Sequence, residues 1–178
     1  LTEEESLEVT RIYSTVKEIK GRIQTPQLRS PHHTSSHVAL VGGGANIKAG
    51  EITLAHHGVL FLDEFPEFEK RVIESLREPL EEGVITISRA KGSVTFPANI
   101  TLIASMNPCP CGYYGSTHKR CTCSPSDIDR YVRKLSGPIM DRIDMWVPVP
   151  HISYETLTNT ENKEEDSATI RTKVFTGR

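Results

Sequence analysis

The feature that most constrains this sequence is an apolar run, Gly58-Val-Leu-Phe-Leu62, that leads directly into Asp63 and Glu64. The run does not alternate between apolar and polar residues, which is typical of a strand buried on both faces of a parallel sheet. It therefore predicts an α/β fold. Ligands in open α/β sheets bind at the carboxyl ends of the strands, so the two carboxylates occupy a position suited to a site.

The residues that follow predict the rest of this core. Apolar residues recur at helical spacing over 68–76, and Gly83 ends that run. Residues 84–88 and 93–96 alternate and predict a β-hairpin, and residues 99–105 form a second run typical of a buried strand. The order strand, helix, hairpin and strand supports a parallel-sheet core with an inserted hairpin.

The N-terminal part predicts a helix followed by a second insertion. Thr2 and Glu5 form a capping box, and apolar residues then recur at helical spacing until Gly21. Residues 37–41 are short and apolar, which favours a strand, and the glycines at 42–44 predict a turn. We expect a hairpin inserted in front of the next core element.

The C-terminal part is less patterned. Ser126 is placed to cap a helix that runs through Leu135, and residues 143–147 predict a further short strand. Residues 155–168 are polar and acidic with little periodicity, so we expect a linker, with a helix starting near Ser167.

Composition narrows the class of protein. The chain has 21 Lys and Arg against 23 Asp and Glu, a net charge of -2, which does not demand a nucleic-acid partner and does not exclude one. No run of eighteen apolar residues occurs, and the N-terminus lacks the regions of a signal peptide, so we expect a cytoplasmic protein without a membrane partner. Because the sequence begins with Leu1, we expect it to be an excerpt of a longer chain.

The carboxylate pair has a chemical interpretation and a plain alternative. In P-loop ATPases an aspartate at this position holds Mg²⁺ between the β- and γ-phosphates, and an adjacent glutamate acts on the attacking water. Asp63 would then hold the metal and Glu64 would act on water. The alternative is a strand that ends in a solvated acidic turn.

Several motifs resemble one family in order and spacing. Residues 58–64 resemble the Walker B motif of the magnesium-chelatase clade of AAA+ proteins, and Asn107 matches the sensor-1 asparagine of that clade. Residues 136–144 resemble the segment that carries its arginine finger. Resemblance to the ComM/YifB branch is strongest at three further segments: 30–34, 42–44 and 50–56.

This resemblance implies a hexameric AAA+ ring ATPase that uses ATP and Mg²⁺, with ComM-type members driving DNA branch migration during natural transformation. It assigns hydrolytic roles to Asp63, Glu64, Asn107 and Arg142. Asn107 would hold the lytic water or a γ-phosphate oxygen, or else be only a strand-end cap. Arg142 would reach the nucleotide of a neighbouring subunit, or else pair locally with Asp141 or Asp144.

The sequence also departs from an intact ATPase. It contains no G-x-x-x-x-G-K-[ST] loop, whose backbone amides and lysine cradle the phosphates. Residues 1–150 are therefore expected to be an AAA+ core fragment without the phosphate loop, and residues 151–178 a linker and the start of the C-terminal lid. We expect an AAA+ fold that is incomplete at both ends and an excerpt that is inactive alone.

Four cysteines lie close together within the insertion at 108–124: Cys109, Cys111, Cys121 and Cys123. Four thiolates suit tetrahedral Zn²⁺, although structural zinc usually prefers two to four residues between paired cysteines, and a loop of reduced thiols is the alternative. Basic and aromatic residues in and after the insertion offer a DNA-binding patch or a merely solvated face: Tyr113, Tyr114, His118, Lys119, Arg120, Arg130, Tyr131, Arg133 and Lys134.

The remaining histidines are interpreted as polar loop and hairpin residues, because no acidic partner stands near them at metal-ligand spacing: His32, His33, His37, His56 and His57. Two further functions stay open beside the DNA motor. One is a chelatase subunit that uses ATP to insert Mg²⁺ into a porphyrin. The other is a zinc-stabilised module that binds nucleic acid without ATP hydrolysis.

Overall fold

A computed structural model describes most of the chain, in four ranges: residues 1–44, 47–89, 92–150 and 165–177. The chain divides into two compact units, Leu1–Trp146 and Val147–Arg178. Residues 151–164, which include most of the predicted linker, lie outside the described residues.

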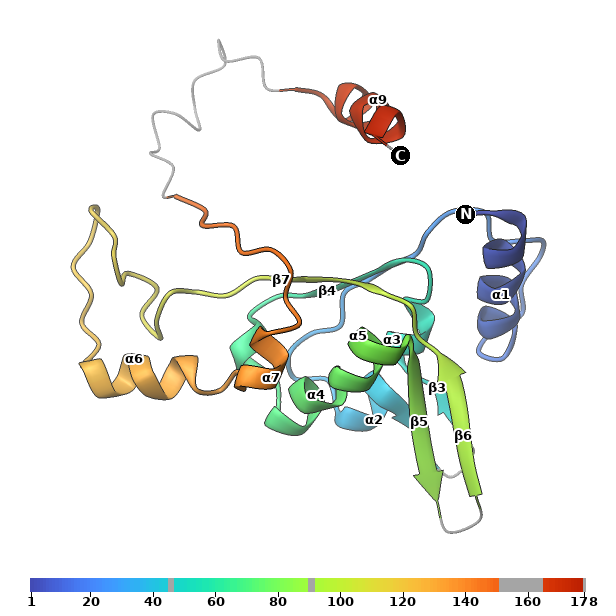
Figure 1. The fold of residues 1–178 in the computed structure, drawn as a ribbon, viewed down its shortest axis with the longest axis horizontal. Coiled ribbons are helices and arrows are strands. Elements are labelled where there is room, and N and C mark those ends of the chain that lie inside the picture. The colour runs from blue at the N-terminus through green and yellow to red at the C-terminus, as the bar shows by residue number, and fades with distance from the viewer. Residues whose placement is uncertain (45–46, 90–91, 151–164, 178) are drawn as a thin grey trace. The chain divides into compact units, whose positions relative to one another are not determined.

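The centre of the first unit is a three-stranded sheet with the order β1-β4-β7 (Figure 1). Its strands are Leu28–Arg29, Val59–Leu62 and Thr101–Ala104. Both pairings are parallel, and Leu62 lies opposite Ala104. The predicted α/β class with a parallel AAA+-type core is therefore confirmed, and the ends of β4 and β7 meet at one edge.

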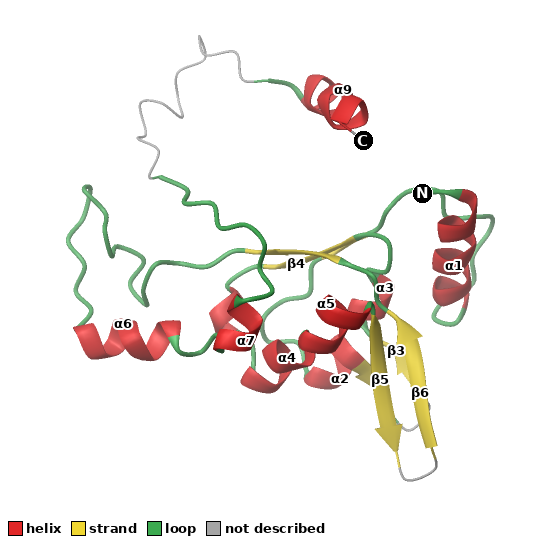
Figure 2. Cartoon of the chain, viewed as in Figure 1, coloured by secondary structure: helices red, strands yellow, loops and turns green. Residues whose placement is uncertain are grey.

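Short helices cover one face of this sheet (Figure 2). They are α2 His37–Val41, α3 Glu51–Leu54, α4 Lys70–Ser75, α5 Arg77–Glu82 and α7 Gly137–Met140. Leu60 and Leu62 of β4 are fully buried in the cluster that these helices build. The opposite face is more open: Ile103 on β7 is 48% exposed, so the prediction of a strand buried on both faces at 99–105 is wrong. β7 is an edge strand among the described residues.

Two hairpins interrupt the core. The larger joins β5 (Val84–Arg89) to β6 (Gly92–Pro97) as predicted, and Gly83 caps the preceding helix with φ +66°. The smaller pairs two-residue strands, β2 (Gly42–Gly43) and β3 (Lys48–Ala49). A hairpin is present near the predicted place, but it is built from two of the glycines predicted as its turn and not from residues 37–41.

The N-terminal helix α1 spans Glu3–Ser14 and begins with the predicted capping box of Thr2 and Glu5. It ends well before Gly21, although Ile19 still packs near its apolar side. Val9, Ile12 and Tyr13 of α1 bury against Leu54 of α3, and this contact forms a second, smaller core.

Three local predictions are corrected. Residues 37–41 form helix α2 instead of a strand, because the Ser36 side chain accepts from the Ala39 amide and caps a helical turn. The helix after the cysteines, α6 (Pro125–Val132), is capped by Ser124 and not by Ser126. Residues 143–147 adopt no regular structure.

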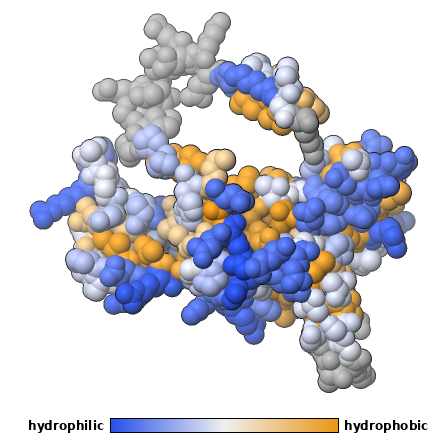
Figure 3. All heavy atoms as spheres, viewed as in Figure 1, coloured by the Kyte–Doolittle hydropathy of each residue, from blue (hydrophilic) through white to orange (hydrophobic). Residues whose placement is uncertain are grey.

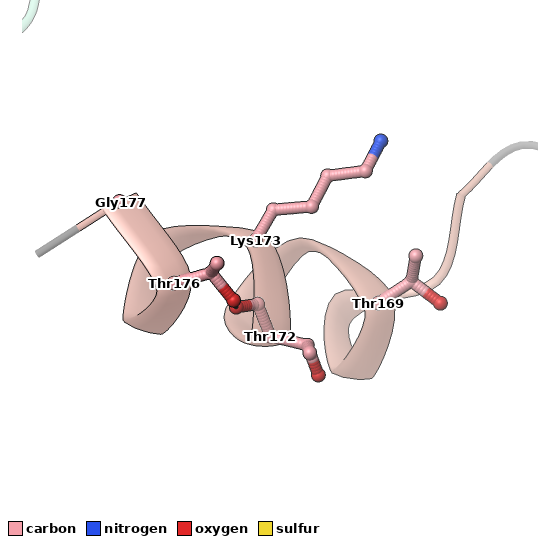
Figure 4. Close-up of a pocket in the computed structure, with 5 residues that line it drawn as sticks. All are labelled: Thr169, Thr172, Lys173, Thr176 and Gly177. Carbon is pink, nitrogen blue, oxygen red and sulfur yellow. The ribbon is translucent and has the colours of Figure 1, made fainter.

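The second unit contains the predicted C-terminal helix, α9 (Ser167–Gly177). Figure 3 shows apolar side chains on this helix, and Ile170, Val174 and Phe175 are exposed. A hollow beside this helix is lined by residues of α9 alone, among them Thr169, Thr172 and Lys173 (Figure 4). Since a single helix encloses nothing, the hollow is not a candidate site.

Among the described helices, none has the length and apolar character needed to cross a bilayer.

Candidate functional site

Asp63 and Glu64 follow β4 directly, and Ser105 follows β7. Since these strands are adjacent and parallel, Ser105 lies beside the carboxylates: its hydroxyl donates to Asp63 Oδ1, and its amide donates to the Leu62 carbonyl at 3.0 Å. The Glu64 amide donates to the same Asp63 oxygen at 3.0 Å. Asp63 is thus oriented by two donors while its side chain stays exposed to solvent.

Glu64 has an unusual backbone. Its φ is +54°, a left-handed conformation that costs a residue other than glycine about 1–3 kcal/mol. The following residue, Phe65, is buried and its amide donates to the Ser105 carbonyl at 2.9 Å, which holds the turn in place. The strained turn directs the chain into the short helix η1 (Phe65–Glu67) and leaves the Glu64 carboxylate exposed at the sheet edge.

The Glu64 carboxylate has a partner that sequence reasoning missed. Nδ1 of His33 lies 3.0 Å from Glu64 Oε2, and the His33 ring packs edge-on against Phe68 with centroids 6.4 Å apart. His33 lies in a loop, as interpreted, but an acidic partner reaches it from a distant part of the chain. Nothing in the spacing of residues 33 and 64 pointed to the contact, because it depends on how the loop after β1 folds over the sheet edge.

Asn107 lies three residues beyond the end of β7 and is exposed. It stands near two other parts of the structure. Burial raises the pKa of Tyr131 on α6, and a hydrogen bond with the Asn107 backbone partly opposes this rise. A Cβ atom on Gly112 would lie 4.0 Å from Asn107 Oδ1. Asn107 thus follows the strand that pairs with β4, and its neighbours here are Tyr131 and Gly112.

Arg142 follows α7 and is not joined to that group in this chain. Its guanidinium forms an ion pair with Glu81 on α5 and donates to the Pro138 carbonyl. Its Nε atom is buried without a hydrogen-bond partner among the described residues. The local pairing that the sequence suggested, with Asp141 or Asp144, is replaced by a pair with a residue 61 positions earlier in the chain.

The four cysteines converge. All four sulfur atoms lie within 4.8 Å of one another, and Cys109 is fully buried. The Sγ–Sγ separations are 3.4 Å from Cys109 to Cys111, 3.7 Å from Cys109 to Cys121 and 3.5 Å from Cys111 to Cys121. The cluster lies in the chain between Asn107 and helix α6.

A second group of potential ligands joins Glu8 to His56 and His57, with Nε2 atoms 3.0 and 2.9 Å from the same carboxylate oxygen. Sequence spacing gave these histidines no acidic partner, because Glu8 lies 48 residues before His56. The group is nevertheless poorly suited to a metal ion. Because the Asn99 amide donates to Nδ1 of His56 at 3.0 Å, the Nε2 atom of the neutral ring carries the proton and has no lone pair to offer. Glu8 acts here as the acceptor that fastens α1 to the core.

The basic residues around the insertion are partly neutralised. Lys134 pairs with Glu67 at 2.9 Å, and Arg130 pairs with Asp127 at 3.3 Å. Lys119 lies over the ring of Tyr113, 4.6 Å from its centroid. This contact keeps one cation and one aromatic face together on the insertion, the combination that single-stranded nucleic acids contact.

Comparison with known proteins decides the family. The family model described as magnesium chelatase, subunit ChlI, matches residues 1–157. The chain belongs to the magnesium-chelatase family. It is 47% identical over 98% of its length to uncharacterized protein YifB of Salmonella typhimurium, and equally identical over 98% of its length to competence protein ComM of Haemophilus influenzae. The ComM/YifB resemblance is confirmed.

A more distant relative is the zygotic DNA replication licensing factor mcm6 of Xenopus tropicalis, 30% identical over 56% of the chain and 11% of that protein. The chain spans only 35% of the YifB protein and 34% of ComM. It is thus similar to about a third of the length of each of these proteins.

Proposed function

We propose that this chain carries the hydrolytic carboxylates of an ATP-driven AAA+ ring motor that acts on DNA. One observation carries the proposal. Asp63 and Glu64 stand at the carboxyl end of β4, and Ser105 and Asn107 follow the neighbouring parallel strand at the same edge. This is where open α/β sheets bind nucleotides, and it gathers a metal-binding carboxylate, a base and an amide.

The residues present fit Mg²⁺. The ion prefers oxygen ligands and usually retains waters, and Asp63 offers an exposed carboxylate oriented by Ser105 and by the Glu64 amide. Asp63 would hold Mg²⁺, and the ion would supply positive charge against the charge of the transferring phosphoryl group.

Glu64 is the proposed general base. Its carboxylate is exposed, and His33 holds it from one side without covering it. In this proposal Glu64 accepts a proton from the attacking water, and the Asn107 side chain orients that water or a γ-phosphate oxygen without adding charge. Arg142 of a neighbouring subunit would complete the site, because a guanidinium there offsets charge developing on the phosphate oxygens.

Residues 1–178 alone are proposed to be inactive, since they contain no phosphate-binding loop. The full-length protein is proposed to be a cytoplasmic homohexamer. The names of its relatives support a DNA partner: one is a competence protein, and another is a DNA replication licensing factor. The Lys119–Tyr113 pair on the insertion adds a cation and an aromatic ring, which are the groups that single-stranded nucleic acids contact.

The family description favours a second candidate, an ATPase subunit that drives Mg²⁺ insertion into a porphyrin. The two functions differ in what stimulates hydrolysis. A DNA motor should hydrolyse ATP faster when branched or single-stranded DNA is added, whereas a chelatase subunit should respond to its partner subunits and a porphyrin. DNA binding with no ATP turnover under any condition would favour a binding module instead.

The direct test uses the full-length protein and turns the Glu64 carboxylate into an amide. Glu64→Gln should leave ATP binding intact and lower kcat by roughly 10²- to 10⁴-fold, the usual effect of losing a positioned base. Glu67→Gln is a matched control, because Glu67 lies in η1 nearby and pairs with Lys134 instead of facing the sheet edge. An unchanged kcat in the Glu64 variant would remove this residue from the mechanism.

A further inference from the structure

We propose that Cys109, Cys111, Cys121 and Cys123 bind one structural Zn²⁺ ion, and that this ion fixes the chain between β7 and α6. The inference stands apart from ATP hydrolysis. A protein without ATPase activity would still bind the ion, and an active ATPase without it would disprove only this inference.

The sulfur positions fit a single tetrahedral ion. Zn–S bonds of about 2.3 Å place the four sulfur atoms of a tetrahedral site about 3.8 Å apart. The separations among Cys109, Cys111 and Cys121 are 3.4 to 3.7 Å, and Cys123 lies within the same 4.8 Å limit. Only a small expansion of the cluster is needed to admit the ion.

A tight turn explains how a C-x-C pair reaches one ion despite its short spacing. The Gly112 amide donates to the Cys109 carbonyl at 3.0 Å, and Gly112 has φ +81°, which reverses the chain directly after Cys111. The Tyr114 amide then donates to Cys109 Sγ at 3.3 Å. An amide directed at sulfur stabilises a thiolate, the form in which cysteine binds metal.

Other uses of the four cysteines fit less well. All four are free thiols, and separations of 3.4 Å and more are far from the ~2.05 Å of a disulfide. Four-thiolate sites hold either zinc or iron–sulfur clusters. A cluster of several iron and sulfide ions spreads its cysteines over a larger volume than one ion, whereas these sulfur atoms nearly touch.

The location of the ion gives it a positioning role. Cys109 is two residues after Asn107, and Cys123 immediately precedes Ser124, the N-cap of α6. Tyr131 of α6 is buried beside the Asn107 backbone. An ion shared by both ends of the insertion would therefore tie the segment that carries Asn107 to the start of α6. It would do so without touching the reacting atoms.

The test begins with the full-length protein purified without chelators. We expect about one zinc per chain by elemental analysis. Replacing zinc by Co²⁺ should give the thiolate-to-metal charge-transfer band and the intense visible bands of tetrahedral cobalt. The double variant Cys109→Ser, Cys123→Ser should lose the zinc. Ser124→Ala is the control, because it removes the cap of α6 at the same place and leaves all four thiols.

The positioning role has its own measurement. Removing zinc from the unmodified protein with a strong chelator should raise hydrogen exchange in residues 109–123 and at the start of α6, and adding zinc back should reverse the change. This experiment does not depend on whether the cysteine variant folds. Protein without zinc, protein with iron in its place, or zinc release that leaves exchange unchanged would each overturn the proposal.

Discussion

Glu81 on α5 forms an ion pair with Arg142, the residue that the family resemblance assigns as arginine finger. The Arg142 side chain is only 20% exposed, and its Nη1 also donates to the Pro138 carbonyl. In this chain the guanidinium is therefore directed into its own subunit. A finger that acts on a neighbouring nucleotide has to leave or share this pair, and Glu81 is then a residue that sets how readily Arg142 becomes available.

Arg142→Ala in the full-length protein should abolish ATP turnover at the nucleotide of the neighbouring subunit. Because a finger acts on the next subunit, variant subunits mixed into unmodified rings should lower activity more steeply than their proportion. Turnover measured over a series of mixing ratios checks this expectation, and a linear decline would argue against it.

Glu81→Gln is the matched variant for Arg142. It keeps the size of the side chain but removes the charge that holds the guanidinium. If Arg142 acts only as a finger, this variant should retain turnover. A loss equal to that of Arg142→Ala would show instead that the ion pair supports the fold, which a drop in thermal stability of both variants would confirm.

His33→Ala should lower kcat while leaving KM for ATP nearly unchanged. The change removes the 3.0 Å contact to Glu64, so the carboxylate loses one restraint on its direction. Removing such a supporting contact typically costs on the order of 10-fold in activity. His32→Ala is the control for the loop, because His32 bonds to Thr34 and not to Glu64, although its ring also packs against that of His33 with centroids 4.2 Å apart. Equal effects in both variants would place the cause in the loop as a whole.

The core of the site was predictable, because one strong signal defined it. The uninterrupted apolar run before Asp63 identified the strand, and Asn107 was singled out by its place after the second run and by the family resemblance. The contact of Ser105 with Asp63 was not anticipated. Local hydrogen bonds decided what the pattern could not. The Ser36 cap converts residues 37–41 into a helix, although their composition favours a strand.

Long-range contacts were beyond sequence reasoning. The pairs His33–Glu64 and Arg142–Glu81 join residues whose separation follows no period. The degree of burial was also missed at β7. A run of apolar residues shows that a strand prefers a covered environment, but Ile103 lies on an edge strand whose second face is open among the described residues.

The folded state should lose stability in acid through His56. Burial lowers the pKa of His56 below its ordinary 6.5, an effect that nearby Glu8 and Glu5 oppose and His57 reinforces. The unfolded state thus binds a proton more readily than the folded state. The stabilisation is complete above about pH 6.5 and is lost as the pH falls through the folded pKa.

A local measurement tests this pH dependence. Protonation of His56 would end its acceptance of the Asn99 amide, so the protection of that amide from hydrogen exchange should fall in acid, after correction for the intrinsic rate. His56→Gln retains an acceptor but does not titrate, so its protection should vary less with pH. A pH profile that is the same in both proteins would assign the effect to another group.

Residues 1–178 alone should bind Mg·ATP weakly and hydrolyse none. Asp63 and Glu64 are both exposed carboxylates at the sheet edge, and without the backbone amides and lysine of a phosphate loop they repel a triphosphate. Mg²⁺ offsets that repulsion only in part. Isothermal titration should therefore give no Kd below about 1 mM. A longer chain that includes a phosphate loop should regain affinity, whereas Asp63→Asn in the short chain should not. Tight binding with phosphate release by residues 1–178 would contradict the argument.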